Sequence, residues 1–450
     1  MISPPSRFTV KSRAPTRIVG PSGSFTAVVL LLLLVSIPFT RSWLPSRTTA
    51  FLQKRRASAA EVAHSFEKKE FRPSWFATNP HFQTIVGTLF RKDTMYSQDL
   101  SIQNLFSKIL HRNKSGNLKP LDVFQWDKRE RVETPDGDFF HVDWKTCPET
   151  KTDSLEAPPI VLICHGLQAS SESPIAQEMA IAFNNVQFDA QCINFRGCSG
   201  ESNLSPRSYH AGFTDDLLYQ ISRINKSAPN RRIYLAGFSL GAGVVTKLLA
   251  ELGEDASIKY NICGAAVNAV PFDLSQCAHC LNKDGLSKRL YGDRLLKSMK
   301  DRIYEQYDSI EFPFDRDEID KCNSIMDVEN ILIAATFGFK DAWDYYEKSK
   351  TIDVLDTIRV PAYVLQALDD PFFEGVENPV IDLSCAVNIH YTRYGGHCGY
   401  IFSTEKQDDS DISWMPTQLA RFLVHVDTNH DNTQEANDKM IVPKKANTTR

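Results

Sequence analysis

Acidic residues are missing from the first 60 positions of this chain, which nevertheless contain nine lysines and arginines. The full sequence of 450 residues has 51 basic and 55 acidic side chains, so the part after position 60 has 42 basic and 55 acidic ones, a net charge of −13. An acidic body is poorly suited to binding a polyanion, which excludes nucleic acid as the expected partner. The near-neutral net charge of the whole chain is therefore the sum of a basic head, residues 1–60, and an acidic body, residues 61–450.

The sequence also has few cysteines and histidines at the spacing that metal ligands require. The ten cysteines are scattered at irregular intervals, unlike the dense framework of a small disulfide-bonded secreted domain. Cys277 and Cys280 form one CxxC pair, but no second pair and no HxxxH accompanies it, whereas a structural zinc ion takes four ligands. We therefore expect no metal site. We expect no organic cofactor either.

No hydrophobic run reaches the full length of a membrane-spanning helix. Residues 18–40 are 23 uncharged residues, and their strongly apolar part, Phe25 to Phe39, includes Pro38. A full span needs about 20 apolar residues, whereas the core of a signal peptide needs about 7–15. The run lies between these limits and predicts contact with a membrane or with the translocation machinery.

Two interpretations of this head remain open. No small-x-small cleavage site directly follows the run, which favours a retained single-pass anchor at 25–40 that holds the protein on an endomembrane. The alternative is a cleaved bipartite plastid presequence, because residues 40–60 are rich in Ser, Thr, Ala and Arg and the Thr49-Ala50-Phe51 stretch resembles the Ala-Phe junction of algal plastid presequences.

Beyond residue 128 the sequence alternates between strands and helices. Val132 to Phe140 predicts two strands around a Pro-Asp-Gly turn. Helix-like stretches lie near 175–183, 213–226 and 242–252. The further predicted strands are Ile160–Cys164, Ala190–Asn194, Ile233–Ala236, Ile262–Val267, Ala362–Gln366 and Ala386–Tyr391. This alternation predicts an α/β fold with a mostly parallel sheet covered on both faces.

The interval from about 270 to 348 interrupts this alternation. It contains an amphipathic basic stretch from Leu286 to Tyr307 and a second helical stretch from Ala335 to Tyr346. An insertion of this size between two sheet strands predicts a helical cap over one end of the sheet.

The segment that carries chemistry is Gly237-Phe238-Ser239-Leu240-Gly241, a G-x-S-x-G motif. The pattern alone is weak, but here an apolar strand enters it and a helix-forming segment leaves it. That strand–turn–helix setting is the one that a nucleophile elbow requires. Glycine at both flanks removes the Cβ atoms that would collide with neighbouring backbone. The sequence therefore predicts Ser239 as a nucleophile.

A serine nucleophile needs a base, and the base needs an orienting carboxylate. In this type of fold they follow the serine in the order Asp, His, each after a strand. Asp369 and Asp370 follow one predicted strand, and His397 follows the next. We favour Asp370 over Asp369 because the residue next to Pro371 is the usual acid. The predicted triad is Ser239, Asp370 and His397.

The predicted strand 160–164 ends in His165-Gly166-Leu167. Backbone N–H groups of Leu167 and Leu240 would form the oxyanion hole. His165 is interpreted as structural, since His397 fills the role of base. His210 and Asp215 also fit an HxxxxD acyltransferase pattern, which two fixed positions support only weakly.

Together these motifs resemble the α/β-hydrolase group often called AB hydrolase superfamily 4, over about Phe71 to Val424. Its members include bacterial esterases, plant embryogenesis-associated proteins, membrane-anchored animal α/β-hydrolase domain proteins and yeast medium-chain ethyl ester synthases. The segments that carry the resemblance are Pro80–Thr84, His165–Leu167, Asn194–Glu201, Arg207–Gly212, Gly237–Gly241, Asp369–Phe372 and Gly395–His397. The resemblance implies the same triad and ester substrates with medium or long acyl chains, including glycerolipids.

We expect five parts: a basic tail at 1–24, an anchor or signal segment at 25–40, a linker and extension at 41–128, an α/β-hydrolase domain at 129–426 and a disordered tail at 427–450. The expected function is a membrane-associated serine hydrolase for lipid or acyl esters. Two alternatives stay open, acyl transfer to an alcohol or lyso-lipid and a catalytically silent scaffold. The sequence does not predict an oligomeric state.

Overall fold

The chain divides into two units, Met1–Phe51 and Leu52–Arg450. A computed structural model describes residues 58–87, 124–148, 157–307, 309–401 and 414–441, all within the second unit. The predicted anchor or signal segment at 25–40 lies outside the described residues. Among the described helices, none is both long enough and apolar enough to cross a membrane.

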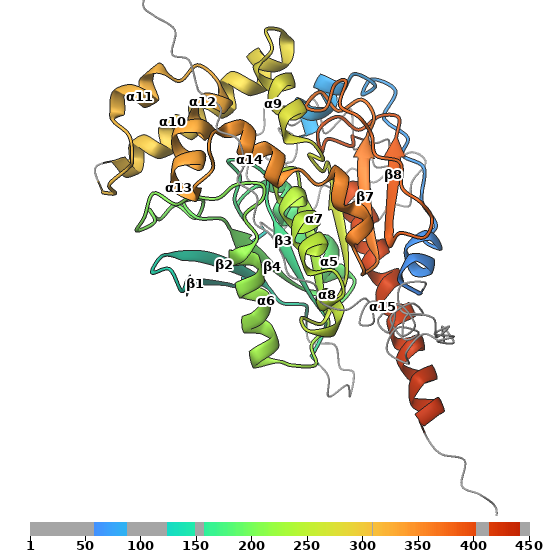
Figure 1. Cartoon of the computed structure of the whole chain (residues 1–450). Coiled ribbons are helices and arrows are strands. Elements are labelled where there is room, and N and C mark those ends of the chain that lie inside the picture. The colour runs from blue at the N-terminus through green and yellow to red at the C-terminus, as the bar shows by residue number, and fades with distance from the viewer. Residues whose placement is uncertain (1–57, 88–123, 149–156, 308, 402–413, 442–450) are drawn as a thin grey trace, which may run out of the picture. The chain divides into compact units, whose positions relative to one another are not determined.

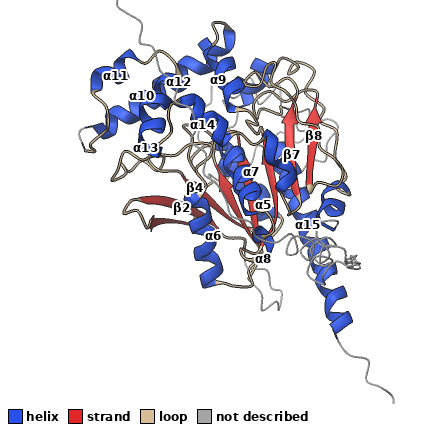
Figure 2. Cartoon of the chain, viewed as in Figure 1, coloured by secondary structure: helices blue, strands red, loops and turns tan. Residues whose placement is uncertain are grey.

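Eight strands of the described part form one sheet in the order β1-β2-β4-β3-β5-β6-β7-β8 (Figures 1 and 2). The strands are β1 (Lys128–Glu133), β2 (Phe139–Lys145), β3 (Ile160–Cys164), β4 (Asp189–Asn194), β5 (Ile233–Phe238), β6 (Ile262–Asn268), β7 (Ala362–Ala367) and β8 (Val387–Thr392). Pairing is antiparallel from β1 to β2 and from β2 to β4, and parallel everywhere else. The predicted mostly parallel sheet is confirmed, and each of the six further predicted strands is present within two residues of its expected bounds.

Strand β3 shows how the sheet supports two cores. Ile160, Leu162 and Cys164 pack into the core on one face, and Val161 and Ile163 pack into the core on the other. All five side chains are fully buried. A strand that is buried on both faces reads as a continuous apolar run, which is why the sequence signal here is strong.

Helices cover both faces of the sheet. The helices α6 (Asp215–Ser227) and α7 (Leu240–Leu252) bury their apolar residues in the first core, whereas α5 (Pro174–Asn185) and α15 (Trp414–Ile441) bury theirs in the second. The short α8 (Asp255–Ile258) follows α7.

The predicted cap consists of helices between β6 and β7. These are α9 (Leu274–Asn282), α10 (Asp293–Tyr307), α11 (Arg316–Lys321), α12 (Ile325–Glu329), α13 (Ala335–Phe337) and α14 (Ala342–Ser349), with π-helical turns at Lys288–Gly292 and Asn330–Ala334, and a 3₁₀ helix at Ile352–Thr357 before β7. They have a hydrophobic core of their own. In Figure 1 the cap lies above the upper end of the sheet.

Two sequence predictions in this part need correction. The stretch from Ala335 to Tyr346 is not one helix, because Gly338 adopts a left-handed φ of 76° that ends α13, and Asp341 caps a new helix by accepting from the N–H of Asp344. The predicted disordered tail does not begin at residue 427, since α15 continues to Ile441. The Asp427 carboxylate accepts hydrogen bonds from Arg232 and Tyr234, which holds this part of the helix on the sheet. Residues 442–450 lie outside the described residues.

The segment before the sheet is more than a linker. Residues 58–64 and 80–87 are helical. Phe66 and Phe71 are buried against α15 in the second core, where the ring of Phe71 meets Trp414 at 4.9 Å between centroids. The described residues between 58 and 87 are therefore part of the folded body, which starts well before the predicted boundary at 129.

Candidate active site

Ser239 stands at the sharp turn between β5 and α7. Its backbone has φ 54° and ψ −128°, a conformation that residues other than glycine rarely adopt. A Cβ at Gly237 would lie 2.7 Å from the carbonyl oxygen of Gly241, and a Cβ at Gly241 would lie 2.2 Å from that of Cys164. Both flanks of the motif therefore require glycine, as the sequence predicts.

His397 lies in the loop after β8, and Asp370 lies in the loop after β7. The Nε2 of His397 is 2.9 Å from the Oγ of Ser239, and its Nδ1 is 2.7 Å from the Oδ2 of Asp370. The structure thus brings together three residues that are up to 158 positions apart in the sequence. The chain of contacts is the one that proton transfer from a serine to a histidine needs.

The two neighbouring carboxylates have different surroundings. Asp370 is buried, and its Oδ1 accepts from the N–H of Phe372. Asp369 accepts instead from the N–H of Gly396 at 2.9 Å. Burial raises the pKa of Asp369 to about 6, and the nearby charge of Asp370 adds to this effect. Of the two carboxylates, Asp370 is the one that contacts the imidazole.

The helical residues 80–87 support the His397 loop, a contribution that the sequence reading missed. The N–H of His397 donates to the hydroxyl of Thr84 at 2.9 Å, and the hydroxyl donates to the carbonyl of Pro80. The buried Gln83 bonds both the N–H of Ile401 and the carbonyl of Ala77. The Pro80–Thr84 motif was recognisable, but its spatial partner lies more than 300 positions later.

The predicted oxyanion donors flank the serine. Leu240 is the first residue of α7, where a backbone N–H has no acceptor within its helix. A Cβ on Gly166 would lie 3.3 Å from the Cβ of Ser239, so the loop that carries Leu167 passes directly beside the serine. Both leucines line the cavity next to Ser239.

His165 anchors the start of this loop. Its ring is fully buried, its Nε2 accepts from the N–H of Phe195 at 3.1 Å, and its Nδ1 lies 2.8 Å from the carbonyl oxygen of Gly166. This pattern assigns the proton to Nδ1. Burial lowers the pKa of His165 to about 3, so the ring is neutral. These contacts agree with the structural interpretation of His165.

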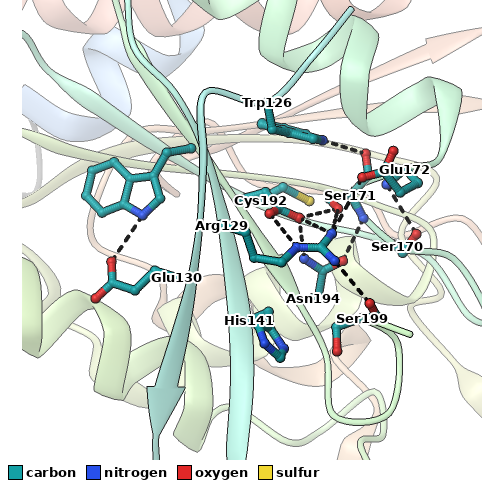
Figure 3. Close-up of polar contacts among 12 residues, drawn as sticks. Trp126, Arg129, Glu130, His141, Ser170, Ser171, Glu172, Cys192, Asn194 and Ser199 are labelled. Carbon is teal, nitrogen blue, oxygen red and sulfur yellow. Dashed lines mark hydrogen bonds and ion pairs between the residues drawn. The ribbon is translucent and has the colours of Figure 1, made fainter. Parts of the chain in front are cut away.

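The far end of the same loop is fixed by the polar cluster shown in Figure 3. The Oγ of Ser171 donates to the buried carboxylate of Asp143 at 2.5 Å, and the N–H of Ser171 donates to the side chain of Asn194. Arg129 makes two bonds of 2.8 Å to Asp143 and neutralises it. The cluster ties Ser171, four residues after Leu167, to β2 and β4.

A cavity of about 450 Å³ opens beside Ser239 and His397. Most of its wall is apolar and comes from the cap and from the loops above the sheet; representative lining residues are Ile85, Leu274, Leu281, Leu290, Leu295 and Phe373. A cavity of this size and character suits a ligand with a substantial apolar part.

Other sequence candidates have ordinary surroundings. His210 is buried among Phe337, Phe339 and Tyr345, and burial lowers its pKa to about 3, which does not suit a general base at neutral pH. Cys277 and Cys280 are free thiols. In the described residues no group of three His, Cys, Asp or Glu side chains is placed to hold a metal ion.

Comparisons with known proteins agree with this fold. Residues 159–278 match the family described as the alpha/beta hydrolase fold. YheT of Escherichia coli is 28% identical over 74% of this chain and 88% of its own length. Monoacylglycerol lipase of Saccharomyces cerevisiae is 30% identical over 61% of each chain. Medium-chain fatty acid ethyl ester synthase/esterase 2 of the same yeast is 26% identical over 68% of this chain and 72% of its own. The chain therefore has the α/β-hydrolase fold, and its similarity to proteins named as an esterase, a lipase and an ester synthase/esterase supports a serine hydrolase.

Proposed function

We propose that this protein hydrolyses carboxylic esters of lipids, or other esters with medium or long acyl chains, through an acyl-enzyme on Ser239. The observation that carries the proposal is the continuous set of contacts from Ser239 to His397 to Asp370 at the edge of an apolar cavity. His397 is the base, Asp370 orients it, and the N–H groups of Leu167 and Leu240 form the oxyanion hole.

In the first half-reaction the Oγ of Ser239 attacks the ester carbonyl carbon while its proton moves to the Nε2 of His397. The carbonyl oxygen becomes an oxyanion, which the two backbone N–H groups stabilise. The bond to the alcohol oxygen then breaks as His397 returns the proton to the leaving alkoxide. The alcohol departs, and the acyl group stays on Ser239.

In the second half-reaction a water molecule attacks the acyl carbon and gives a proton to His397. The bond between the acyl carbon and the Oγ of Ser239 breaks, Ser239 recovers its proton, and the carboxylic acid leaves. Every proton transfer passes through the same nitrogen, and none of these steps needs a metal or an organic cofactor.

Two observations support a lipid-like substrate. Transfer of an alkyl chain from water to the apolar wall of the cavity favours binding by about 0.8 kcal/mol per buried CH₂ group. The names of two yeast relatives refer to monoacylglycerol and to medium-chain fatty acid ethyl esters. Both point to an apolar acyl group on the substrate.

Acyl transfer is a second candidate. One yeast relative carries both synthase and esterase in its name. An alcohol that takes the place of water in the second half-reaction would make a new ester with the same residues in the same roles.

We also propose that the head of the chain brings the catalytic body to a membrane. This rests on the apolar run within 25–40 and on its basic flanks, which suit an endomembrane anchor. A bipartite plastid presequence is the alternative. Microscopy of the full chain fused at its C-terminus to a fluorescent protein, with and without residues 1–60, separates the two locations.

Activity of the purified full chain tests the enzymatic proposal. We expect hydrolysis of p-nitrophenyl esters to rise with acyl length from acetate to decanoate, and Ser239→Ala to lower kcat by on the order of 10⁴-fold. Ser222→Ala, which removes an exposed hydroxyl on α6, is the matched control. Added ethanol measures transfer as the share of ethyl ester among the products. Full esterase activity in the Ser239→Ala protein would refute the proposal.

A further inference from the structure

One acidic side chain lies in the otherwise mainly apolar wall of the cavity. Glu329 is the last residue of α12 and is 8% exposed. It lines both the large cavity and a smaller adjoining one. Leu240, the residue directly after Ser239, lines the same two cavities. Glu329 therefore borders the space into which an ester held by Ser239 would extend.

The carboxyl group of Glu329 has one hydrogen-bond partner among the described residues. The hydroxyl of Tyr346, on α14, donates to its Oε2. In that part of the chain no lysine, arginine or histidine forms an ion pair with it. Burial raises the pKa of Glu329 to about 7. The Tyr346 bond uses Oε2, so Oε1 keeps its hydrogen-bonding capacity in a residue that lines the cavity.

Packing alone does not account for an acid at this position. The neighbouring residues Val328, Leu332 and Ile333 are buried apolar residues of the cap core. A methionine or leucine at 329 would continue that core without the desolvation cost of a carboxyl group. A buried acid in the wall of a ligand-sized cavity is better explained by a polar group on the ligand.

We propose that Glu329 is a specificity residue that accepts a hydroxyl group carried by the ester substrate. The hydroxyl can belong to the alcohol part, as in a glycerol monoester, or to an oxygenated acyl chain. In both cases the substrate O–H donates to the free oxygen of the carboxyl group. This inference rests on the proposed ester hydrolysis and adds the chemical feature that the site selects.

The carboxyl group also disfavours substrates that lack the hydroxyl. An unsubstituted alkyl group next to Glu329 removes the carboxyl group from water and offers it no hydrogen bond in return. The free-energy cost of this desolvation is larger than the free energy gained from one matched hydrogen bond. The hydroxyl preference is the kcat/KM for the hydroxylated ester divided by the kcat/KM for the plain ester. We expect this preference to be on the order of 10-fold higher in the wild type than in a variant without the Glu329 carboxyl group.

The test compares two pairs of substrates. Ethyl 12-hydroxyoctadecanoate against ethyl octadecanoate places the hydroxyl on the acyl chain, and 1-monooleoylglycerol against ethyl oleate places it on the alcohol. The variants are Glu329→Met and Glu329→Ala, which remove the carboxyl, and Glu329→Gln, which keeps a hydrogen-bonding side chain of the same shape. Glu305→Met on α10, outside the residues that line the two cavities, is the control.

We expect Glu329→Met or Glu329→Ala to lower the hydroxyl preference about 10-fold for one pair, and Glu329→Gln to retain most of it. The pair that responds identifies the part of the substrate that carries the hydroxyl. Unchanged ratios for both pairs in both variants would overturn the inference and leave Glu329 as a structural acid. Absence of hydrolysis of all four esters by the wild type would instead refute the proposed function.

If the wild type hydrolyses none of these esters, a binding measurement still tests the inference. In the Ser239→Ala protein we expect 1-O-hexadecylglycerol to bind more tightly than ethyl hexadecyl ether, with the difference reduced by Glu329→Met or Glu329→Ala. Equal affinities before and after the substitution would overturn the inference for the alcohol part of the substrate. Hexadecane-1,12-diol against hexadecan-1-ol repeats the measurement for a hydroxyl on the chain.

Discussion

The ring of Phe372 lies flat against the imidazole of His397, with centroids 3.9 Å apart and planes within 4° of parallel. Phe372 is two residues after Asp370, and its own N–H donates to that carboxylate. One short turn therefore holds both the edge and the face of the imidazole. We regard this stack as the contact that fixes the orientation of the proposed base.

Replacing Phe372 by alanine should weaken catalysis more than folding. Aromatic pairs contribute about 0.5–1.5 kcal/mol beyond their buried area, so a loss of this contact should lower kcat about 2- to 10-fold. Phe372→Tyr keeps the stacked ring and serves as the control. Steady-state kinetics with p-nitrophenyl octanoate measures the effect, and equal kcat values for the alanine and tyrosine variants would show that the stack does not orient His397.

The hydroxyl of Thr84 is expected to position the His397 loop. Thr84→Val removes the acceptor for the N–H of His397 and should lower kcat while the free energy of unfolding falls by only about 1–2 kcal/mol. Thr428→Val is a suitable control, because Thr428 also donates its hydroxyl to the carbonyl four residues earlier but does so on the exposed part of α15. Rates and urea unfolding should be compared for both variants. A kcat that stays at the wild-type value in Thr84→Val would show that the Thr84 hydroxyl does not position His397 for catalysis.

Gly241 should tolerate no side chain. The Cβ of an alanine would lie 2.2 Å from the carbonyl oxygen of Cys164, which is fixed in β3, so Gly241→Ala should destabilise the fold by about 4 kcal/mol or more or prevent soluble expression. Gly285→Ala meets only one atom, at 3.9 Å, and should change stability by less than about 0.5 kcal/mol. Soluble yield and urea unfolding test the pair, and a stable Gly241→Ala protein would contradict the described elbow.

Asp369 predicts a pH dependence of stability. Its pKa is raised to about 6 in the folded protein, against a reference value of 3.8, so between these values the folded state binds a proton that the unfolded state has released. Wild-type stability should therefore fall, relative to Asp369→Asn, as the pH rises from about 4 to about 6. Because Asp369 is partly exposed, we expect a difference of only about 1–2 kcal/mol.

Urea unfolding of the wild type and Asp369→Asn at pH 4, 5, 6 and 7 measures this dependence. The asparagine keeps an oxygen that can accept from the N–H of Gly396, so the comparison isolates the charge. A constant difference between the two proteins across this range would show that Asp369 does not have a raised pKa.

Much of the sheet could be predicted because β3 to β8 are largely buried strands with short, nearly continuous apolar sequences. The order Ser, Asp, His could be predicted because each residue follows such a strand, and the carboxyl ends of parallel strands meet at one edge. Local sequence was sufficient in both cases.

The remaining features depend on contacts between distant positions. The support of His397 by Thr84 spans 313 positions, and nothing within the Pro80–Thr84 segment indicates its partner. The continuation of α15 past Val426 depends on Asp427 meeting Arg232 and Tyr234 across the fold. Glu329 is the last residue of the short helix α12, and only the assembled cap shows that it is buried beside the cavity.

Covalent labelling tests the central proposal most directly. The full chain is treated with a fluorophosphonate that carries an octyl chain, digested with a protease, and the modified peptide is identified by mass spectrometry. We predict stoichiometric modification of Ser239 in parallel with loss of esterase activity, and no modification of the same peptide in the Ser239→Ala protein. Esterase activity that persists while Ser239 stays unmodified would contradict the account.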